Sequence, residues 1–184
     1  MESIELLLKR QSNPALAAPA PVGEQFTNIL KAGMRVPDHA GLVPWHFTIV
    51  QGEALATLAN IYVDAMKAKG ITDELKLQKA SKMPFRAPMI IVISTRYQTH
   101  EKVPLKEQLI SAGCAAHAMQ MACYAQGFGA MWRTGDLAFD DNVKAALNID
   151  IENDIAGFLY IGTPTKVLPS KAEKSFEPHV TFLS

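Results

Sequence analysis

The sequence has no excess of either charge, which excludes several kinds of partner. Its 184 residues carry 18 basic and 18 acidic side chains, and the formal net charge is zero. Nucleic acids and anionic membranes attract a concentrated excess of Lys and Arg, so we expect neither as a partner. The N-terminus also lacks the basic region and the long apolar core of a signal peptide, which predicts a cytoplasmic location.

Residues for catalysis without a cofactor are equally scarce. The five histidines are scattered, without the close pairing that metal ligation on a helix or loop requires, so we expect no protein-bound metal. The only two cysteines, Cys114 and Cys123, lie nine residues apart in an apolar helical stretch. That spacing is too long for a disulfide, and burial disfavours a reactive thiolate. Because no serine stands in a nucleophile elbow either, an enzyme with this sequence would need a cofactor to carry its chemistry.

What the sequence has in abundance is small apolar residues, concentrated between positions 105 and 125. No Asp, Glu, Lys or Arg stands between Glu107 and Arg133. A helix that is apolar on every face must be buried on every face, and small side chains let other helices come close. We therefore expect a central helix here, packed against a second copy of the chain. Polar residues such as Ser111 and Gln120 interrupt it, so it is not expected to span a membrane.

Hydrophobic periodicity predicts the remaining elements. Helices are expected at about 3–9, 23–34, 53–69, 73–83 and 140–147, and strands at 46–51, 89–94, 129–133 and 155–161, with a strand-like run at 180–183. No repeat or linker divides residues 1–184, so we expect one domain. Four strands among five or six helices indicate an α+β fold, a three-layer sandwich with a central mixed sheet. The C-terminal strand has no obvious partner of its own.

Three arginines stand at the edges of predicted elements, each among polar or aromatic neighbours: Arg10, Arg35 and Arg133. Taken singly, each is typical of a surface ion pair or a helix cap. Two arginines and a hydroxyl would suffice to hold a phosphate, because each charge-assisted hydrogen bond contributes about 1.5 to 3 kcal/mol. Together these residues indicate a site for a mononucleotide.

Three segments together resemble the FMN-dependent nitroreductase family, and in particular its short YdjA-like branch: KRQS at 9–12, MRVPDH at 34–39 leading to VPWHF at 43–47, and QGFGAMWRTG at 126–135. The combined order and spacing are specific, and the resemblance extends from the first helix to the final strand. It implies a homodimer with two FMN sites at the subunit interface, NADH or NADPH as electron donor, and a small-molecule acceptor. It also implies that the C-terminal strand is added to the partner subunit's sheet.

Carried over by position, the resemblance assigns the cofactor site to residues from both subunits. Contacts with the FMN phosphate, ribityl chain and ring edge are expected from Arg10, Gln11 and Ser12, and further FMN contacts from Met131, Trp132 and Arg133. Arg35 and His39 are expected to reach the flavin of the other subunit, whereas without the resemblance His39 would be a solvated loop histidine. A nicotinamide contact is expected along Met121, Ala122, Cys123, Tyr124, Ala125 and Gln126, although a buried helix face offers few polar groups to a dinucleotide.

One position departs from the family pattern. Gln11 replaces the second arginine of an Arg-Arg-Ser triplet. A positive group near the N1 and O2 edge of the ring stabilises the anionic reduced flavin, so a neutral amide facing that edge would lower the reduction potential or weaken FMN binding. Phosphate binding by Arg10 and Arg133 should survive.

The resemblance predicts an oxidoreductase in which hydride passes from NAD(P)H to flavin N5 and then to a nitroaromatic, quinone or similar acceptor, with ping-pong kinetics. Two alternatives stay open. One is a protein that binds or delivers flavin without useful turnover, and the other is a helical scaffold whose apolar helix serves assembly only. The sequence identifies neither the acceptor nor the preferred nicotinamide.

Overall fold

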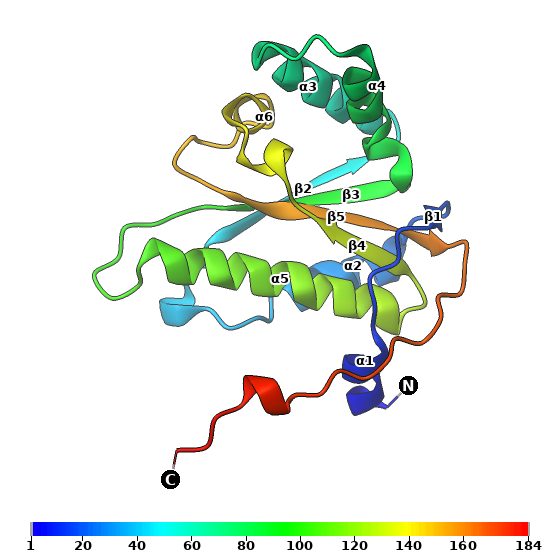
Figure 1. Cartoon of the computed structure of the whole chain (residues 1–184). Coiled ribbons are helices and arrows are strands. Elements are labelled where there is room, and N and C mark those ends of the chain that lie inside the picture. Colours follow the sequence, from blue (N-terminus) through cyan, green and yellow to red (C-terminus); the bar gives the residue numbers. More distant parts are fainter. Residues whose placement is uncertain (1, 184) are drawn as a thin grey trace.

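A five-stranded sheet organises the computed structural model, which describes residues 2–183 (Figure 1). Its central strand, β5 (Ile155–Pro164), pairs with β3 (Met89–Thr95) on one edge and with β4 (Gly129–Arg133) on the other. β2 (Trp45–Gln51) continues the sheet beyond β3, and β1 (Leu16–Ala17) pairs with the end of β5. The register places Ile91 of β3 between Ile49 of β2 and Leu159 of β5.

Helices cover both faces of this sheet and make the three predicted layers (Figure 1). One face carries α3 (Ala54–Ala68), α4 (Glu74–Lys82) and α6 (Asp141–Ala146). The other carries α2 (Gly23–Gly33) and α5 (Leu105–Ala125), with α1 (Ser3–Lys9) beyond α5. Side chains of β3 alternate between the two cores and all seven are buried, as expected for a strand covered on both faces. The predicted α+β sandwich is therefore confirmed.

Two features of the sheet correct the prediction. Every strand pair in the described chain is antiparallel, so the expected mixed sheet is wrong. The connection from β2 to β3 contains two helices that pack against each other, and such a hairpin returns the chain to the end of the sheet that it left. The expected four strands are also too few, because β1 has only two residues and such a length carries no alternating pattern.

The predicted strand at 180–183 pairs with no strand of the described chain. These residues follow a single helical turn, Glu177–His179, and their side chains are exposed. The C-terminal tail, red in Figure 1, passes α1 and then runs away from the sheet. Its addition to the sheet of a partner subunit therefore stays a prediction.

The helix α5 forms where the sequence predicts it, but one of its faces lacks cover within the chain. Ala112, Ala115, Met119 and Cys123 have no exposed surface and pack on the sheet and on α2. A second stripe, with members three, four or seven residues apart, is half-buried or exposed: Ile110, Gly113, Cys114, His117, Tyr124 and Ala125. The expectation that every face is buried is thus wrong for the single chain. No helix in residues 2–183 combines the length and the apolar character needed to cross a membrane.

Local signals fix the ends of the helices. Asp73 accepts hydrogen bonds from the backbone N–H groups of Leu75 and Lys76 at the start of α4. Asp140 does the same for α6 and also accepts from Lys69 Nζ at 2.7 Å. Gly70 follows α3 with a φ of 78°, a conformation that favours glycine. Of these contacts, the Lys69–Asp140 ion pair links the end of α3 to the start of α6.

Candidate functional site

The segment that follows α1 runs beside the edge strand β4. The backbone N–H of Asn13 donates to the carbonyl oxygen of Ala130 at 3.0 Å. From α5, the Gln120 side-chain amide donates to Ser12 Oγ and to the same Ala130 oxygen, both at 3.3 Å. Two predicted groups of site residues, 10–12 and 131–133, therefore meet at one edge of the sheet although more than a hundred positions separate them in the sequence. Gln120 is buried on α5, where it links Ser12 to β4. In the sequence, only its polarity within an apolar helix indicated such a contact.

Two buried guanidinium nitrogens at this edge have no hydrogen-bond partner: Nη1 of Arg10 and Nε of Arg133. Among residues 2–183, no other buried side-chain nitrogen or oxygen is left without one. Neither arginine forms an ion pair with a carboxylate of the described residues. A buried donor without an acceptor costs about 1 to 3 kcal/mol, and more when it is charged. An anion bound at this edge would supply the missing acceptors.

The side chains of β4 point alternately to the two layers. Arg133 lies on the same face as Met131, and its Cζ is 5.5 Å from the ring centroid of Tyr160 in β5. Tyr160 is 3% exposed, and burial raises the pKa of its phenol although the positive charges of Arg133 and Arg86 oppose that shift. The phenol therefore stays neutral beneath the guanidinium. Nothing in the sequence of this buried strand marked Tyr160 as part of the site.

Trp132 faces the opposite layer and packs within its own chain. Its indole Nε1 donates to the carbonyl oxygen of Ala156 at 3.1 Å. The ring lies over Gly157, where an added Cβ would stand 2.0 Å from Nε1, and its far edge lies 3.6 Å from an added Cβ at Gly113 on α5. Any contact of Trp132 with a cofactor therefore falls to its backbone or to the half-exposed edge of the indole.

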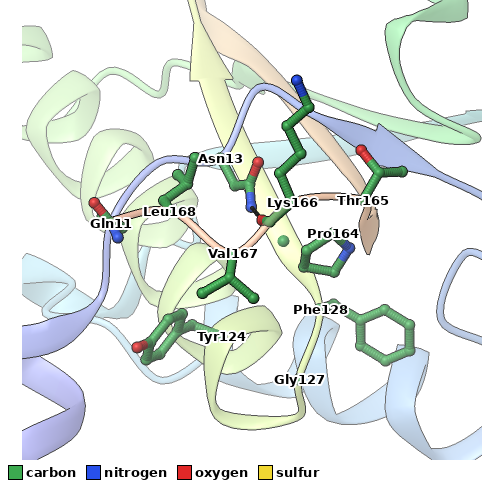
Figure 2. Close-up of a pocket in the computed structure, with 11 residues that line it drawn as sticks. Gln11, Asn13, Tyr124, Gly127, Phe128, Pro164, Thr165, Lys166, Val167 and Leu168 are labelled. Carbon is green, nitrogen blue, oxygen red and sulfur yellow. Dashed lines mark hydrogen bonds between the residues drawn. The ribbon is translucent and has the colours of Figure 1, made fainter. Parts of the chain in front are cut away.

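Gln11, the position that departs from the family pattern, contacts the C-terminal segment. Its side-chain amide donates to the carbonyl oxygen of Pro169 at 3.2 Å, and Asn13 does the same to Lys166 at 3.3 Å. Both contacts border a pocket of about 430 Å³ between residues 11–13, the turn after α5 and the exit of β5 (Figure 2). Tyr124 and Phe128 supply aromatic walls, so the pocket suits an apolar group.

His39, another predicted contact, lies at the far end of α5. His39 Nδ1 is 2.8 Å from Glu107 Oε2, in the first turn of that helix, whereas Ser12 is bound to Gln120. Thirteen residues of α-helix span roughly 20 Å. Arg35 is exposed and forms no ion pair within the described chain. A single chain therefore does not bring His39 to the arginines at the β4 edge.

The segment expected to contact nicotinamide is partly buried, and its polar groups are largely occupied. Cys123 is fully buried, and burial raises the pKa of its thiol to about 12. Gln126 uses its amide to donate to the carbonyl oxygens of Gln25 and Ala122. Of residues 121–126, Tyr124 alone lines the pocket in Figure 2. The nicotinamide contact stays a prediction. As for metals, no group of three His, Cys, Asp or Glu within 2–183 is arranged to hold an ion.

Comparison with solved structures and with family models defines the class of protein. A nitroreductase-like family protein from Bacillus cereus superposes with a TM-score of 0.86 at 17% identity, over 100% of this chain and 96% of that one. A nitroreductase with bound FMN from Bacteroides fragilis gives a TM-score of 0.75 at 21% identity over the full length of both chains. Residues 8–163 match the model of the nitroreductase family. The chain belongs to the nitroreductase family.

Closer relatives define the branch. The chain is 46% identical over 164 residues to YdjA of Escherichia coli strain K12, covering 89% of each protein. It is 38% identical, with the same coverage, to a protein of Haemophilus influenzae. Both relatives carry provisional names as NAD(P)H nitroreductases. The resemblance carried by the segments at 9–12, 34–39 and 126–135 is thereby confirmed, including the YdjA-like branch.

Proposed function

We propose that this chain is a single FMN-binding domain over residues 1–184 that works as an NAD(P)H-dependent oxidoreductase. The observation that carries the proposal is the pair of buried nitrogens without acceptors, Arg10 Nη1 and Arg133 Nε. The phosphate of FMN presents oxygen acceptors and nearly two negative charges, which fits the unmet need of both guanidinium groups. The names of the two relatives, and the FMN bound to a protein of the same fold, support this choice of cofactor and donor.

In this proposal the side chains bind and orient the cofactor, and FMN supplies the hydride chemistry when bound. Arg10 and Arg133 hold the phosphate. The Ser12 hydroxyl, which Gln120 fixes by a hydrogen bond, faces the ribityl chain. Gln11, Met131 and Trp132 border the ring and the chain. The acceptor is a nitroaromatic, quinone or similar small molecule that follows NAD(P)H at the same place, in a cytoplasmic enzyme.

The proposal includes a homodimer with two FMN sites at its interface. In one chain the contacts of His39 and of Ser12 lie roughly 20 Å apart along α5. Antiparallel packing of the exposed α5 stripes of two copies would bring the His39 end of one chain to the Arg10 end of the other. The exposed apolar side chains of the tail, Phe176, Phe182 and Leu183, support its pairing with the partner subunit.

The test starts with FMN binding to the purified protein. Arg133→Ala and Arg10→Ala should each weaken FMN binding roughly 10- to 150-fold, because each removes charge-assisted hydrogen bonds to the phosphate. Fluorescence titration measures the dissociation constant. Arg96→Ala is the matched control, since Arg96 is an exposed arginine at the end of β3, and it should bind FMN like the wild type. A colourless protein that takes up no FMN contradicts the proposal.

Stopped-flow mixing with NADH and NADPH then tests for turnover. The flavin absorbance should bleach with at least one donor and return when menadione or a nitroaromatic is added, with parallel double-reciprocal plots in the steady state. Tight FMN binding without bleaching would favour the alternative, a protein that holds or delivers flavin. Dimerisation without flavin would favour a scaffold.

A further inference from the structure

The buried aromatic cluster behind Arg133 is the starting point. Tyr160 stands in β5 between Met131 of β4 and Ile90 of β3, and it is 3% exposed. The Arg133 guanidinium lies over its ring with Cζ 5.5 Å from the centroid. That distance is within the roughly 6 Å range of a cation–π contact, which is strongest where water is excluded.

The Tyr160 ring also packs in the same core cluster as Tyr62, from the helix layer that covers this face of the sheet. Tyr62 of α3, 1% exposed, lies against the Tyr160 phenol, and burial raises the pKa of both groups. Tyr62 also packs edge-on against Phe158, with ring centroids 5.6 Å apart and an interplanar angle of 82°. The ring beneath Arg133 is therefore fixed by its neighbours and neutral.

An aromatic platform suits an arginine that must bind an anion. Arg133 lies on an edge strand, has no carboxylate partner among residues 2–183, and keeps a buried Nε without an acceptor. A carboxylate would hold the guanidinium but would also neutralise it. The face of a phenol instead restricts the rotamers of the arginine side chain. The charge of the guanidinium and the N–H donors along its edge stay available.

We propose that Tyr160, braced by Tyr62, is a positioning residue that holds Arg133 in place for a phosphomonoester. The inference rests on the proposed function, in which this phosphate belongs to FMN. Tyr160 contributes to FMN affinity only through the contact of Arg133 with the phosphate. Riboflavin has the same ring and ribityl chain without the phosphate, so its affinity should not change when Tyr160 is replaced.

The experiment titrates the full chain, freed of flavin, with FMN and separately with riboflavin, and follows flavin fluorescence. Tyr160→Leu should weaken FMN binding roughly 3- to 30-fold and change riboflavin binding less than about twofold. Tyr160→Phe keeps the ring and should bind FMN within about twofold of the wild type. In the Arg133→Ala background, Tyr160→Leu should cause no further loss of FMN affinity.

Controls separate positioning from a loss of folding. Phe47→Leu removes a partly buried ring from the opposite face of the sheet and should leave the preference for FMN over riboflavin unchanged. Thermal unfolding of the flavin-free variants tests their folding, and Tyr160→Met replaces Tyr160→Leu if the latter does not fold.

Two results would overturn the inference while leaving the proposed function intact. One is an equal loss of FMN and riboflavin affinity in Tyr160→Leu, and the other is no loss at all. A wild-type protein that binds no FMN contradicts the proposed function itself, and the inference with it.

Discussion

At the scale of single residues, Gln11 connects the candidate cofactor segment to the C-terminal tail. Its side-chain amide donates to the carbonyl oxygen of Pro169, so a neutral side chain makes this contact without the charge of an arginine. Arg10 precedes it with a buried nitrogen that lacks an acceptor. Under the proposed function, these neighbouring residues make different contacts, Arg10 with the FMN phosphate and Gln11 with the chain's own backbone.

Removing this amide should loosen the tail. Gln11→Ala loses one exposed hydrogen bond, which contributes about 0.5 to 1.5 kcal/mol, and trypsin should cut faster at Lys166 and Lys171 as a result. Timed digestion followed by mass spectrometry measures the rate at these sites. Gln98→Ala is the matched control, because its amide donates to the carbonyl oxygen of Leu42 away from the tail. Equal rates in wild type and Gln11→Ala would show that the contact does not hold the tail.

The sequence predicts part of the candidate site, and the reason lies in individual residues. Arg133 is recognisable because a lone cation at the end of a long chargeless stretch needs an explanation, and Arg10 because it stands at an element's edge beside polar residues. Tyr160 and Gln120 are not, because one stands in a continuous apolar strand and the other in an apolar helix. Their roles depend on which neighbours the fold brings to them, and periodicity carries no such information.

At the scale of elements, the start of α6 depends on one carboxylate. Burial raises the pKa of Asp140, but the hydrogen bonds from Lys69, Asn142 and Val143 outweigh it and leave the pKa below its usual value. A carboxyl whose pKa is lower in the folded than in the unfolded state stabilises the fold above the unfolded pKa. That stability is lost as pH falls through the folded pKa.

Asp140→Asn tests this pH dependence. Asparagine still caps the helix but loses the charge that meets Lys69, so the variant should be about 1 to 2 kcal/mol less stable than wild type at pH 7. The difference should shrink as pH falls below about 4, where the wild-type carboxyl begins to protonate. Urea unfolding at several pH values measures it. Asp73→Asn, the equivalent cap of α4 without a lysine partner, should show a smaller difference. A gap that stays constant down to pH 3 contradicts the charge argument.

The elements themselves were largely predictable, because apolar periodicity and capping residues act locally. All six helices and the four longer strands occur within a few residues of their expected ends. The antiparallel pairing of β2 with β3 was not predictable, because it depends on whether α3 and α4 form a hairpin. The two residues of β1 are held by their position beside β5, and nothing in their own sequence indicates a strand.

At the scale of the whole molecule, the stripe on α5 should decide the oligomeric state. Ile110→Glu places a charge on this stripe, where Ile110 is 59% exposed in the single chain. If two copies pack through the stripe, the charge would be buried without a partner, and the dimer should dissociate. Light scattering coupled to size-exclusion chromatography measures the mass. Bound FMN should fall in parallel.

A matched variant distinguishes an interface from an ordinary apolar surface. Leu75 on α4 is 78% exposed and lies in the layer on the other face of the sheet, so Leu75→Glu should leave the mass unchanged. A monomeric wild-type protein, or an Ile110→Glu variant that remains dimeric with full FMN content, would contradict the proposed interface.

The length of α5 has a consequence for complementation between mutant alleles. Under the proposed function each site combines the Arg133 end of one subunit with the His39 end of the other, because one chain holds these ends roughly 20 Å apart. Two defective alleles, one altered at Arg133 and one at His39, would then complement each other. Their mixed dimer would contain one doubly damaged site and one site with every native residue.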